Sequence, residues 1–307
     1  MPRPVDSRLG HRPGPEWVAR PERSTAPVMR WMARLALLVG RPVARLLLYP
    51  ICLYFLIFSV RARAASSRYL SRALGRKPRV RDVFRHYHTF AGVVLDRVYL
   101  LTDQYSRFDV HVHGSEIVDE LAARGEGCLL LGAHLGSFEI VRSLGRAALG
   151  SRVRMLMYEE NARKLGSVLE AINPDLHRQV ILLGRVDSIL KVEAALKQGA
   201  FVGILGDRTI NGEGTIPCRF LGENARFGIG PFRIATMLDS QIVLMFGVFR
   251  GGSRYDIYFE RLAAIRPANR KERSRASEES LKQYVGRLEH YCRLAPYNWF
   301  NFYDYWE

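Results

Sequence analysis

The stretch GAHLGSFE, Gly132 to Glu139, comes directly after the apolar run Cys128 to Leu131. Such a run predicts a buried strand, and the amphipathic residues Ser137 to Leu149 predict a helix that begins inside the quoted stretch. In open α/β sheets, ligands gather where strands end and helices begin. The stretch therefore predicts an α/β fold and marks its own histidine, His134, and Glu139 as candidate site residues.

The chain on either side continues the same alternation of short apolar runs and amphipathic stretches, which is typical of an α/β domain. A glycine pair separates the last two predicted strands, so we expect them to form a hairpin and the central sheet, flanked by helices, to be mixed. The further predicted strands are Val153 to Met157, Val180 to Leu183, Phe201 to Leu205, Ile242 to Phe249 and Tyr255 to Phe259, and the further predicted helices are Ala162 to Ile172, Ser188 to Gln198 and Ser277 to Arg293.

Positive charge is concentrated at the start of the chain. The protein has 307 residues and a formal net charge of +16, and residues 1–81 hold 17 Arg and Lys against Asp6, Glu16 and Glu22. A protein that binds nucleic acid along its folded surface would spread this charge over the globular part. We therefore expect anionic membrane lipids as a partner, and no nucleic acid.

An uncharged run of 15 residues, Leu46 to Val60, lies within this basic region. As a helix it would cover ~22 Å, short of the ~30 Å hydrocarbon core of a bilayer. Arginines flank it on both sides, which favours an anchor in the cytoplasmic leaflet over a clean crossing; a buried core helix is the alternative. We divide the chain into a disordered basic tail (1–30), a membrane anchor (31–68) and a catalytic domain (69–307).

The residues of GAHLGSFE leave several chemistries open. Gly132 and Gly136 allow the chain to fold the His134 ring back toward Glu139, and a carboxylate in that place would fix the tautomer of a general base. A purely structural histidine is the plain alternative. Ser137 is a conceivable nucleophile, but no GxSxG pattern surrounds it. A zinc site would need more ligands, and the four scattered cysteines supply neither a zinc site nor a disulfide framework, so we expect no metal and a reducing compartment.

Two further blocks carry candidate residues. GDRT places Asp207 and Arg208 at the end of another predicted strand, on the same edge of the sheet as His134. Arginine is well shaped to hold a phosphate, although an Asp207 to Arg208 contact that caps a loop is equally compatible. In PCRFLGENARFGIGP, Arg219 and Arg226 flank a glycine-rich turn, and Gly230-Pro231 can open a helix whose free N–H groups face an anion. We assign these four residues to substrate binding.

These motifs, in this order, resemble the lysophospholipid and lipid A acyltransferase superfamily, in particular the branch of the lauroyl and myristoyl transferases of lipid A. The resemblance runs from about Trp31 to the C terminus. It rests on the basic apolar anchor, the His-x4-Glu of GAHLGSFE, RHYHTFAGVVLDRVYLL (85–101), GDRT (206–209), FLGENARFGIGPFRIA (220–235) and the aromatic ending PYNWFNFYDYW (296–306).

The resemblance implies an O-acyltransferase of the bacterial inner membrane with its catalytic domain on the cytoplasmic face. It implies that His134 is the base and Glu139 its partner, that an acyl carrier protein or coenzyme A thioester is the donor, and that a lipid or glycolipid hydroxyl is the acceptor. No other cofactor is expected. The chain departs from the PEGTR-like pattern of the glycerol-3-phosphate branch, which disfavours those acceptors. A non-catalytic membrane-binding protein on the same scaffold, or a thioesterase, are the alternatives.

Overall fold

The computed structural model describes residues 26–158, 179–184, 187–209, 214–263 and 269–306. A seven-stranded sheet in the order β1-β9-β8-β2-β5-β3-β4 forms the centre, and β6 and β7 form a separate hairpin. The strands are β1 (Asp109–His113), β2 (Cys128–Gly132), β3 (Val153–Tyr158), β4 (Val180–Leu183), β5 (Phe201–Leu205), β6 (Thr215–Phe220), β7 (Glu223–Gly228), β8 (Ile242–Gly251) and β9 (Arg254–Arg261).

The central sheet is mostly parallel. Strand β2 lies between β5 and β8 and is parallel to both, and the antiparallel pair β8–β9 makes the sheet mixed, as the glycine pair at its turn predicts. All five side chains of β2 are buried. A strand covered on both faces reads as a continuous apolar run, which is why CLLL has no alternation.

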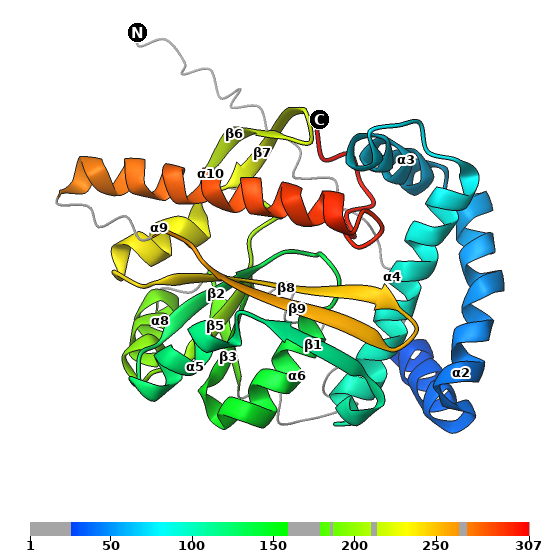
Figure 1. Ribbon diagram of the computed structural model, residues 1–307, viewed down its shortest axis with the longest axis horizontal. Helices are drawn as coiled ribbons and strands as arrows, with labels where there is room; N and C mark the ends of the chain where they lie inside the picture. Colours follow the sequence, from blue (N-terminus) through cyan, green and yellow to red (C-terminus); the bar gives the residue numbers. More distant parts are fainter. Residues whose placement is uncertain (1–25, 159–178, 185–186, 210–213, 264–268, 307) are drawn as a thin grey trace, which may run out of the picture.

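Helices cover both faces of the sheet (Figure 1). One core cluster joins alternate residues of β2 and β8 to α8 and α10, and the other joins the intervening residues to α5 and α6. The helices are α2 (Ala26–Phe58), α3 (Val60–Leu74), α4 (Val80–Leu101), α5 (Ser115–Ala123), α6 (Phe138–Leu149), α8 (Ser188–Lys197), α9 (Gly230–Met237) and α10 (Arg270–Leu294), with short 3-10 turns at Tyr105–Arg107 and Gly150–Arg152.

The N-terminal helices stand at one end of the sheet, with α2 alongside α4 (Figure 1). Gly40 has φ 79° and ψ 158°, so α2 is two helical pieces joined at a kink. Arg41, just after the kink, holds the buried carboxylate of Asp96 on α4 through Nε (2.7 Å) and Nη2 (2.9 Å). Arg45 also approaches Asp96, at 3.7 Å. Two of the arginines expected to face lipid thus point into the protein.

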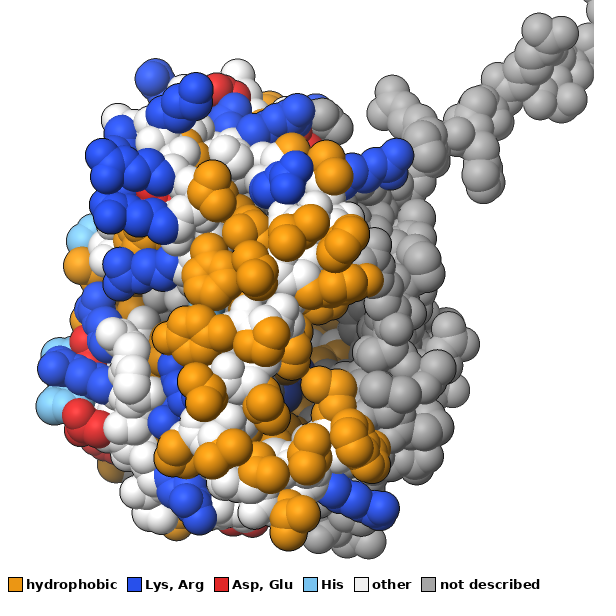
Figure 2. Space-filling view, turned by 90° about the vertical axis from the view of Figure 1, so that its right-hand side faces the viewer, with side chains coloured by type: hydrophobic (Ala, Val, Ile, Leu, Met, Phe, Trp, Pro, Cys, Tyr) orange, Lys and Arg blue, Asp and Glu red, His pale blue; other side chains and the backbone are white. Residues whose placement is uncertain are grey.

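The opposite side of α2 is apolar and exposed. Figure 2 shows a continuous strip of apolar side chains on this face, bordered by Lys and Arg. Among the described residues, Trp31–Phe58 is the one helical stretch long and apolar enough to cross a membrane, and only 22% of its most apolar window is buried. That low burial contradicts the alternative of a buried core helix. The strip includes Leu38, Leu46, Leu53, Tyr54, Ile57 and Phe58.

Most elements predicted from the sequence are present with nearly the expected bounds. The clearest difference is α10, which begins at Arg270 instead of Ser277 because the Asn269 side chain caps it by accepting a hydrogen bond from the Glu272 N–H (2.9 Å). The helix predicted over 162–172 and most of the tail predicted to be disordered, residues 1–25, lie outside the described residues.

Candidate active site

Strand register brings the GAHLGSFE and GDRT turns together. β2 and β5 are parallel neighbours, and their last paired residues are Gly132 and Leu205. The Gly206 N–H donates to the Gly132 carbonyl (3.0 Å), which continues the ladder past both strand ends. His134 and Asp207 each lie two residues beyond that register, so they leave the sheet at the same edge. The prediction that GDRT shares an edge with His134 is confirmed.

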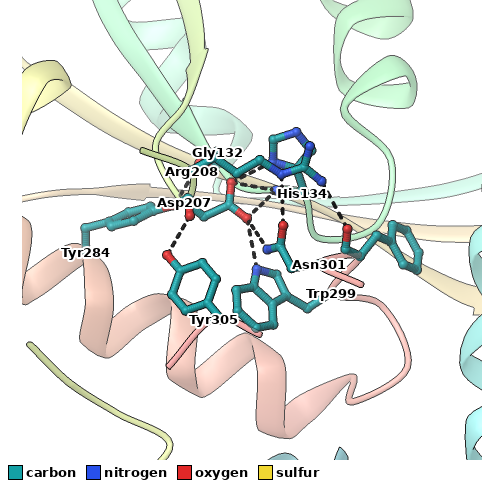
Figure 3. A network of polar contacts seen from close by, with 9 residues as sticks. Gly132, His134, Asp207, Arg208, Tyr284, Trp299, Asn301 and Tyr305 are labelled. Atoms are coloured by element: carbon teal, nitrogen blue, oxygen red, sulfur yellow. Dashed lines mark hydrogen bonds and ion pairs between the residues drawn. The ribbon is translucent and has the colours of Figure 1, made fainter. Parts of the chain in front are cut away.

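His134 and Asp207 form the central pair of the site (Figure 3). Nδ1 of His134 lies 2.8 Å from Oδ1 of Asp207, and the His134 backbone N–H donates to the same carboxylate at 3.0 and 3.1 Å. Because an ionised carboxylate only accepts hydrogen bonds, Nδ1 carries the proton and Nε2 keeps its lone pair. No hydrogen bond to Nε2 is made by the described residues. The His134 side chain is 29% exposed, so an acceptor can reach it.

The Asp207 carboxylate has no exposed side-chain surface, and residues near the C terminus hold it in place. Trp299 Nε1 and Asn301 Nδ2 both donate to Oδ2 at 2.9 Å. The Tyr305 hydroxyl donates to the Asp207 carbonyl at 2.5 Å. Figure 3 shows these side chains converging on Asp207 from the last segment of the chain. The aromatic ending therefore packs beneath the site.

Burial and the positive charge beside it keep the His134 ring neutral. Burial, followed by the positive charge of Arg208, lowers the pKa of His134, and the contact with Asp207 only partly opposes this. The pKa of Asp207 lies well below its usual range, because the His134 contact and the Arg208 charge outweigh the effect of burial. At neutral pH the pair is a neutral imidazole on a carboxylate. Such a pair accepts a proton at Nε2 and stabilises the resulting cation.

The loop between His134 and α6 is fixed to the sheet and to the C-terminal segment. Gly136 has φ 65°, and a Cβ there would lie 2.0 Å from the Gly247 carbonyl oxygen, so only glycine fits. Its N–H donates to Asn298 O (2.8 Å), and the Phe300 N–H donates to His134 O (2.7 Å). Ser137 is buried, and its hydroxyl accepts from the Ile140 N–H (3.3 Å), as a helix cap does.

The prediction that Glu139 contacts His134 is wrong. Glu139 lies in the first turn of α6 and faces α4, where Oε1 meets Nη2 of Arg97 at 3.0 Å. Its other oxygen accepts from Nε of Arg142 at 2.8 Å. Once Ser137 caps the helix, Glu139 belongs to a regular turn that points away from the strand end. The carboxylate that contacts His134 is thus Asp207, which the sequence assigned to substrate binding, and not Glu139.

The remaining predicted residues lie apart from one another. Arg208 is beside the central pair, where its Nε donates to Asn301 Oδ1 (2.9 Å) and its Nη2 to Phe300 O (3.1 Å). Arg219 and Arg226 are exposed on the β6–β7 hairpin, and Arg226 donates to Thr215 Oγ1 (3.0 Å). Pairing of Arg219 with Asn224 places both arginines on the same face of that hairpin.

Five residues of the site were not singled out from the sequence: Arg97, Arg142, Trp299, Asn301 and Tyr305. For the pairing of His134 with Asp207, one available signal was the parallel placement of β2, which ends at Gly132, and β5, which ends at Leu205, because it brings the second residue beyond each end together. Nothing local in the sequence marks the C-terminal residues as partners of Asp207. Within the described ranges, no group of three or more His, Cys, Asp or Glu side chains could hold a metal ion.

Comparison with known families gives one match. The model of the family described as bacterial lipid A biosynthesis acyltransferase covers residues 28–307, nearly the whole chain. Among curated proteins, no sequence matches this chain.

Proposed function

Because the chain belongs to the bacterial lipid A biosynthesis acyltransferase family and is therefore an acyl-transfer enzyme, we propose that His134 is its general base and Asp207 the partner of that base. The observation that carries the proposal is the 2.8 Å contact between Nδ1 and Asp207, which leaves Nε2 as the basic, accessible nitrogen. This assignment replaces Glu139 as the partner. Glu139 keeps a role at the site, but through two arginines instead of through the histidine.

The reaction is direct transfer of an acyl group from a thioester to a hydroxyl. The acceptor oxygen attacks the thioester carbonyl carbon while its proton moves to Nε2 of His134, a contribution of ~10² to 10⁴ in rate. Asp207 stabilises the imidazolium that forms. The carbon–sulfur bond then breaks, the thiolate takes the proton from Nε2, and an ester and a free thiol result. His134 ends in its starting state, and the buried Ser137 has no part in these steps.

The substrates follow from the family and from the basic side chains near the site. The family implies an acyl donor and a lipid A precursor as acceptor. We propose an acyl carrier protein or coenzyme A thioester as the donor and a hydroxyl of a lipid or glycolipid as the acceptor. Arg208 beside His134, and Arg219 and Arg226 on the hairpin, are proposed to bind phosphate groups of these substrates, because arginine pairs with phosphate through two hydrogen bonds.

The exposed apolar face of α2 supports a place on the membrane. We propose that this face lies in the cytoplasmic leaflet of the bacterial inner membrane, with the catalytic domain on the cytoplasmic side. The Arg41–Asp96 contact supports a helix that lies along the surface, because a crossing helix would have to give up a buried ion pair with α4. The arginines at the border of the apolar face suit anionic lipid, at about 1 kcal/mol each.

The test is release of free thiol from a dodecanoyl thioester on acyl carrier protein, with an underacylated lipid A precursor as the acceptor. His134→Ala should lower the rate by ~10² or more, whereas His290→Ala, at an exposed histidine on α10, should not. Normal turnover by His134→Ala would refute the proposal. Equal thiol release with and without the acceptor would identify a thioesterase, and no release from any donor would indicate a non-catalytic scaffold.

A further inference from the structure

A second charged cluster lies where α4 meets α6, beside the His134–Asp207 pair. Glu139 binds Arg97 of α4 through one oxygen (3.0 Å) and Arg142 of α6 through the other (2.8 Å). Glu139 and Arg142 are each 3% exposed. The proposed acyl transfer, as far as His134 and Asp207 carry it, uses none of these three side chains.

The cluster has more positive than negative charge. Two guanidinium groups share one carboxylate, and Nη1 of Arg142 is buried without a hydrogen-bond partner among the described residues. Burying uncompensated charge is costly, so a fold retains it where an anion arrives. Asp207 does not offset the surplus, because the positive charge of Arg208 acts on it and none of its hydrogen bonds comes from Arg97 or Arg142.

Arg97 is the member of the cluster that reaches the surface. Its side chain is 35% exposed, and Glu139 is the one acceptor that it contacts in the described part of the chain. A guanidinium has five N–H donors, so several remain available on the outer side. Arg97 is held against the first turn of α6, the helix that directly follows the His134 loop, which places it next to the site. Its charge also lowers the pKa of His134.

We propose that Arg97 is a catalytic residue which donates to the carbonyl oxygen of the thioester as that oxygen becomes negative, and that Glu139 and Arg142 are positioning residues which hold its guanidinium. The inference rests on the proposed role of His134. When the acceptor oxygen bonds to the carbonyl carbon, an electron pair moves onto the carbonyl oxygen, and it returns when the carbon–sulfur bond breaks. A preorganised cation beside that oxygen stabilises the intermediate more than the substrates.

The proposed oxyanion role of Arg97 gives Glu139 a different function from that of Asp207. Asp207 touches the base, whereas Glu139 acts only through Arg97. A phosphate on either substrate would be a second anion suited to Arg97, but it is present before the reaction starts. Binding it would appear in KM, whereas stabilising the transient oxyanion appears in kcat. This difference lets kinetics decide between the two anions.

The experiment measures thiol release from dodecanoyl-acyl carrier protein with the lipid A precursor for the full-length enzyme, Arg97→Ala, Arg97→Lys and Glu139→Gln. Arg81→Ala, at an exposed arginine on the first turn of α4, is the matched control. We expect Arg97→Ala and Arg97→Lys to lose kcat by a factor on the order of 10², with the KM of both substrates changed less than about threefold. Glu139→Gln should lose kcat in the same direction, and Arg81→Ala should match the wild type.

Two further readouts exclude a merely structural role. Added guanidinium should restore part of the kcat of Arg97→Ala, because it fills the vacated place, and it should not help His134→Ala. The acid limb of the rate profile should move to higher pH in Arg97→Ala, which loses the charge, and stay in place in Arg97→Lys, which keeps it. A normal kcat for Arg97→Ala, a change confined to KM, or a loss without rescue and with lowered thermal stability would each overturn the inference.

The His134→Ala variant in the same assay separates the two proposals. If it is active, the proposed base is wrong and the role of Arg97 falls with it. If it is inactive while Arg97→Ala is normal, the base stands and only the oxyanion role of Arg97 is refuted.

Discussion

Nδ1 of His134 lies 2.8 Å from Oδ1 of Asp207, although 73 residues separate the two in the chain. The same carboxylate also accepts the backbone N–H of His134, so it fixes both the ring and the strand end that carries it. The position of the His134 ring is therefore set by the register of β2 against β5 and not by the four residues between His134 and Glu139.

Replacing Asp207 by Asn should lower the acyl-transfer rate by ~10² to 10⁴. An amide no longer stabilises the imidazolium, and it can present a donor to Nδ1, which would put the ring proton on Nε2. Glu139→Gln leaves the His134–Asp207 contact intact. Because Asp207 raises the pKa of His134, the acid limb of the pH–rate profile should move to lower pH in Asp207→Asn and stay in place in Glu139→Gln. Asp207→Asn activity within a few-fold of wild type would contradict the pairing.

Gly136→Ala should abolish activity and destabilise the fold. The added methyl group would meet the Gly247 carbonyl oxygen at 2.0 Å, and the backbone also holds φ 65°. Gly222→Ala is a matched control, since Gly222 has φ 93° but no atom within 4 Å of a built Cβ. We expect the control to cost about 1 kcal/mol and keep its activity. Thermal unfolding measures the stability of the two variants, and thiol release measures their activity. If Gly136→Ala and Gly222→Ala have equal effects, the protein relieves the clash at Gly136.

Acid should destabilise the protein partly through His86. This residue is fully buried between Ser66 Oγ (2.8 Å) and Trp299 O (2.9 Å), and burial lowers its pKa to about 4. The unfolded chain takes up this proton near pH 6.5, so stability falls as pH drops from about 6.5 toward 4, by roughly 3 kcal/mol. His86→Gln should show a smaller loss of unfolding temperature between pH 7 and pH 4.5. An identical pH dependence in the variant would exclude this contribution.

Asp96→Ala should loosen α2 from α4. Arg41 would lose its carboxylate in a largely buried place, and breaking such a pair costs about 3–5 kcal/mol. The Tyr255 hydroxyl, which donates to Asp96 at 2.9 Å, would lose its acceptor too. Limited proteolysis should cut α2 faster in the variant. The double change Asp96→Leu with Arg41→Met should restore much of the protection, and no difference in cleavage for Asp96→Ala would show that α2 is held by other contacts.

Charge on the exposed face of α2 should weaken membrane binding. Leu46 and Phe58 are 67% and 62% exposed, and burying such a side chain in lipid contributes about 2 kcal/mol. Leu46→Glu with Phe58→Glu should lower co-sedimentation with vesicles of mixed zwitterionic and anionic lipid by at least about tenfold. Leu190→Glu, at a 66% exposed leucine on α8, should bind as wild type does. Unchanged binding of the double variant would place the contact surface elsewhere.

The sequence predicts the bounds of a strand or helix well where residues next to it in the chain determine where it begins and ends. Phe201 to Leu205 and Val180 to Leu183 have the predicted bounds, because a glycine or a polar residue limits each apolar run. Asp207 was assigned correctly to the edge of His134 but not to its ring. The partner of the His134 ring depends on which of the two carboxylates, Glu139 or Asp207, faces it. The Ser137 cap begins α6 so that Glu139 turns toward α4, which leaves Asp207 at the ring.

The partners of Asp207 could not be found in the same way. Trp299 and Asn301 lie more than 90 positions after it, and their contacts depend on how the last segment runs under the sheet. Arg97 lies 42 positions before Glu139, on a helix whose sequence pattern indicates only that it is amphipathic. Long-range pairing of this kind leaves no periodic signal in one sequence.

The hydrogen bonds from Trp299, Asn301 and Tyr305 to Asp207 also set the order in which activity can arise during biosynthesis. The strands that carry His134 and Asp207 are made first, but the carboxylate gains its indole and amide donors only when the end of the chain has been translated. A nascent polypeptide that has not reached Tyr305 would hold the proposed base, His134, without these contacts to Asp207, so we expect premature termination to yield an inactive enzyme instead of a partly active one.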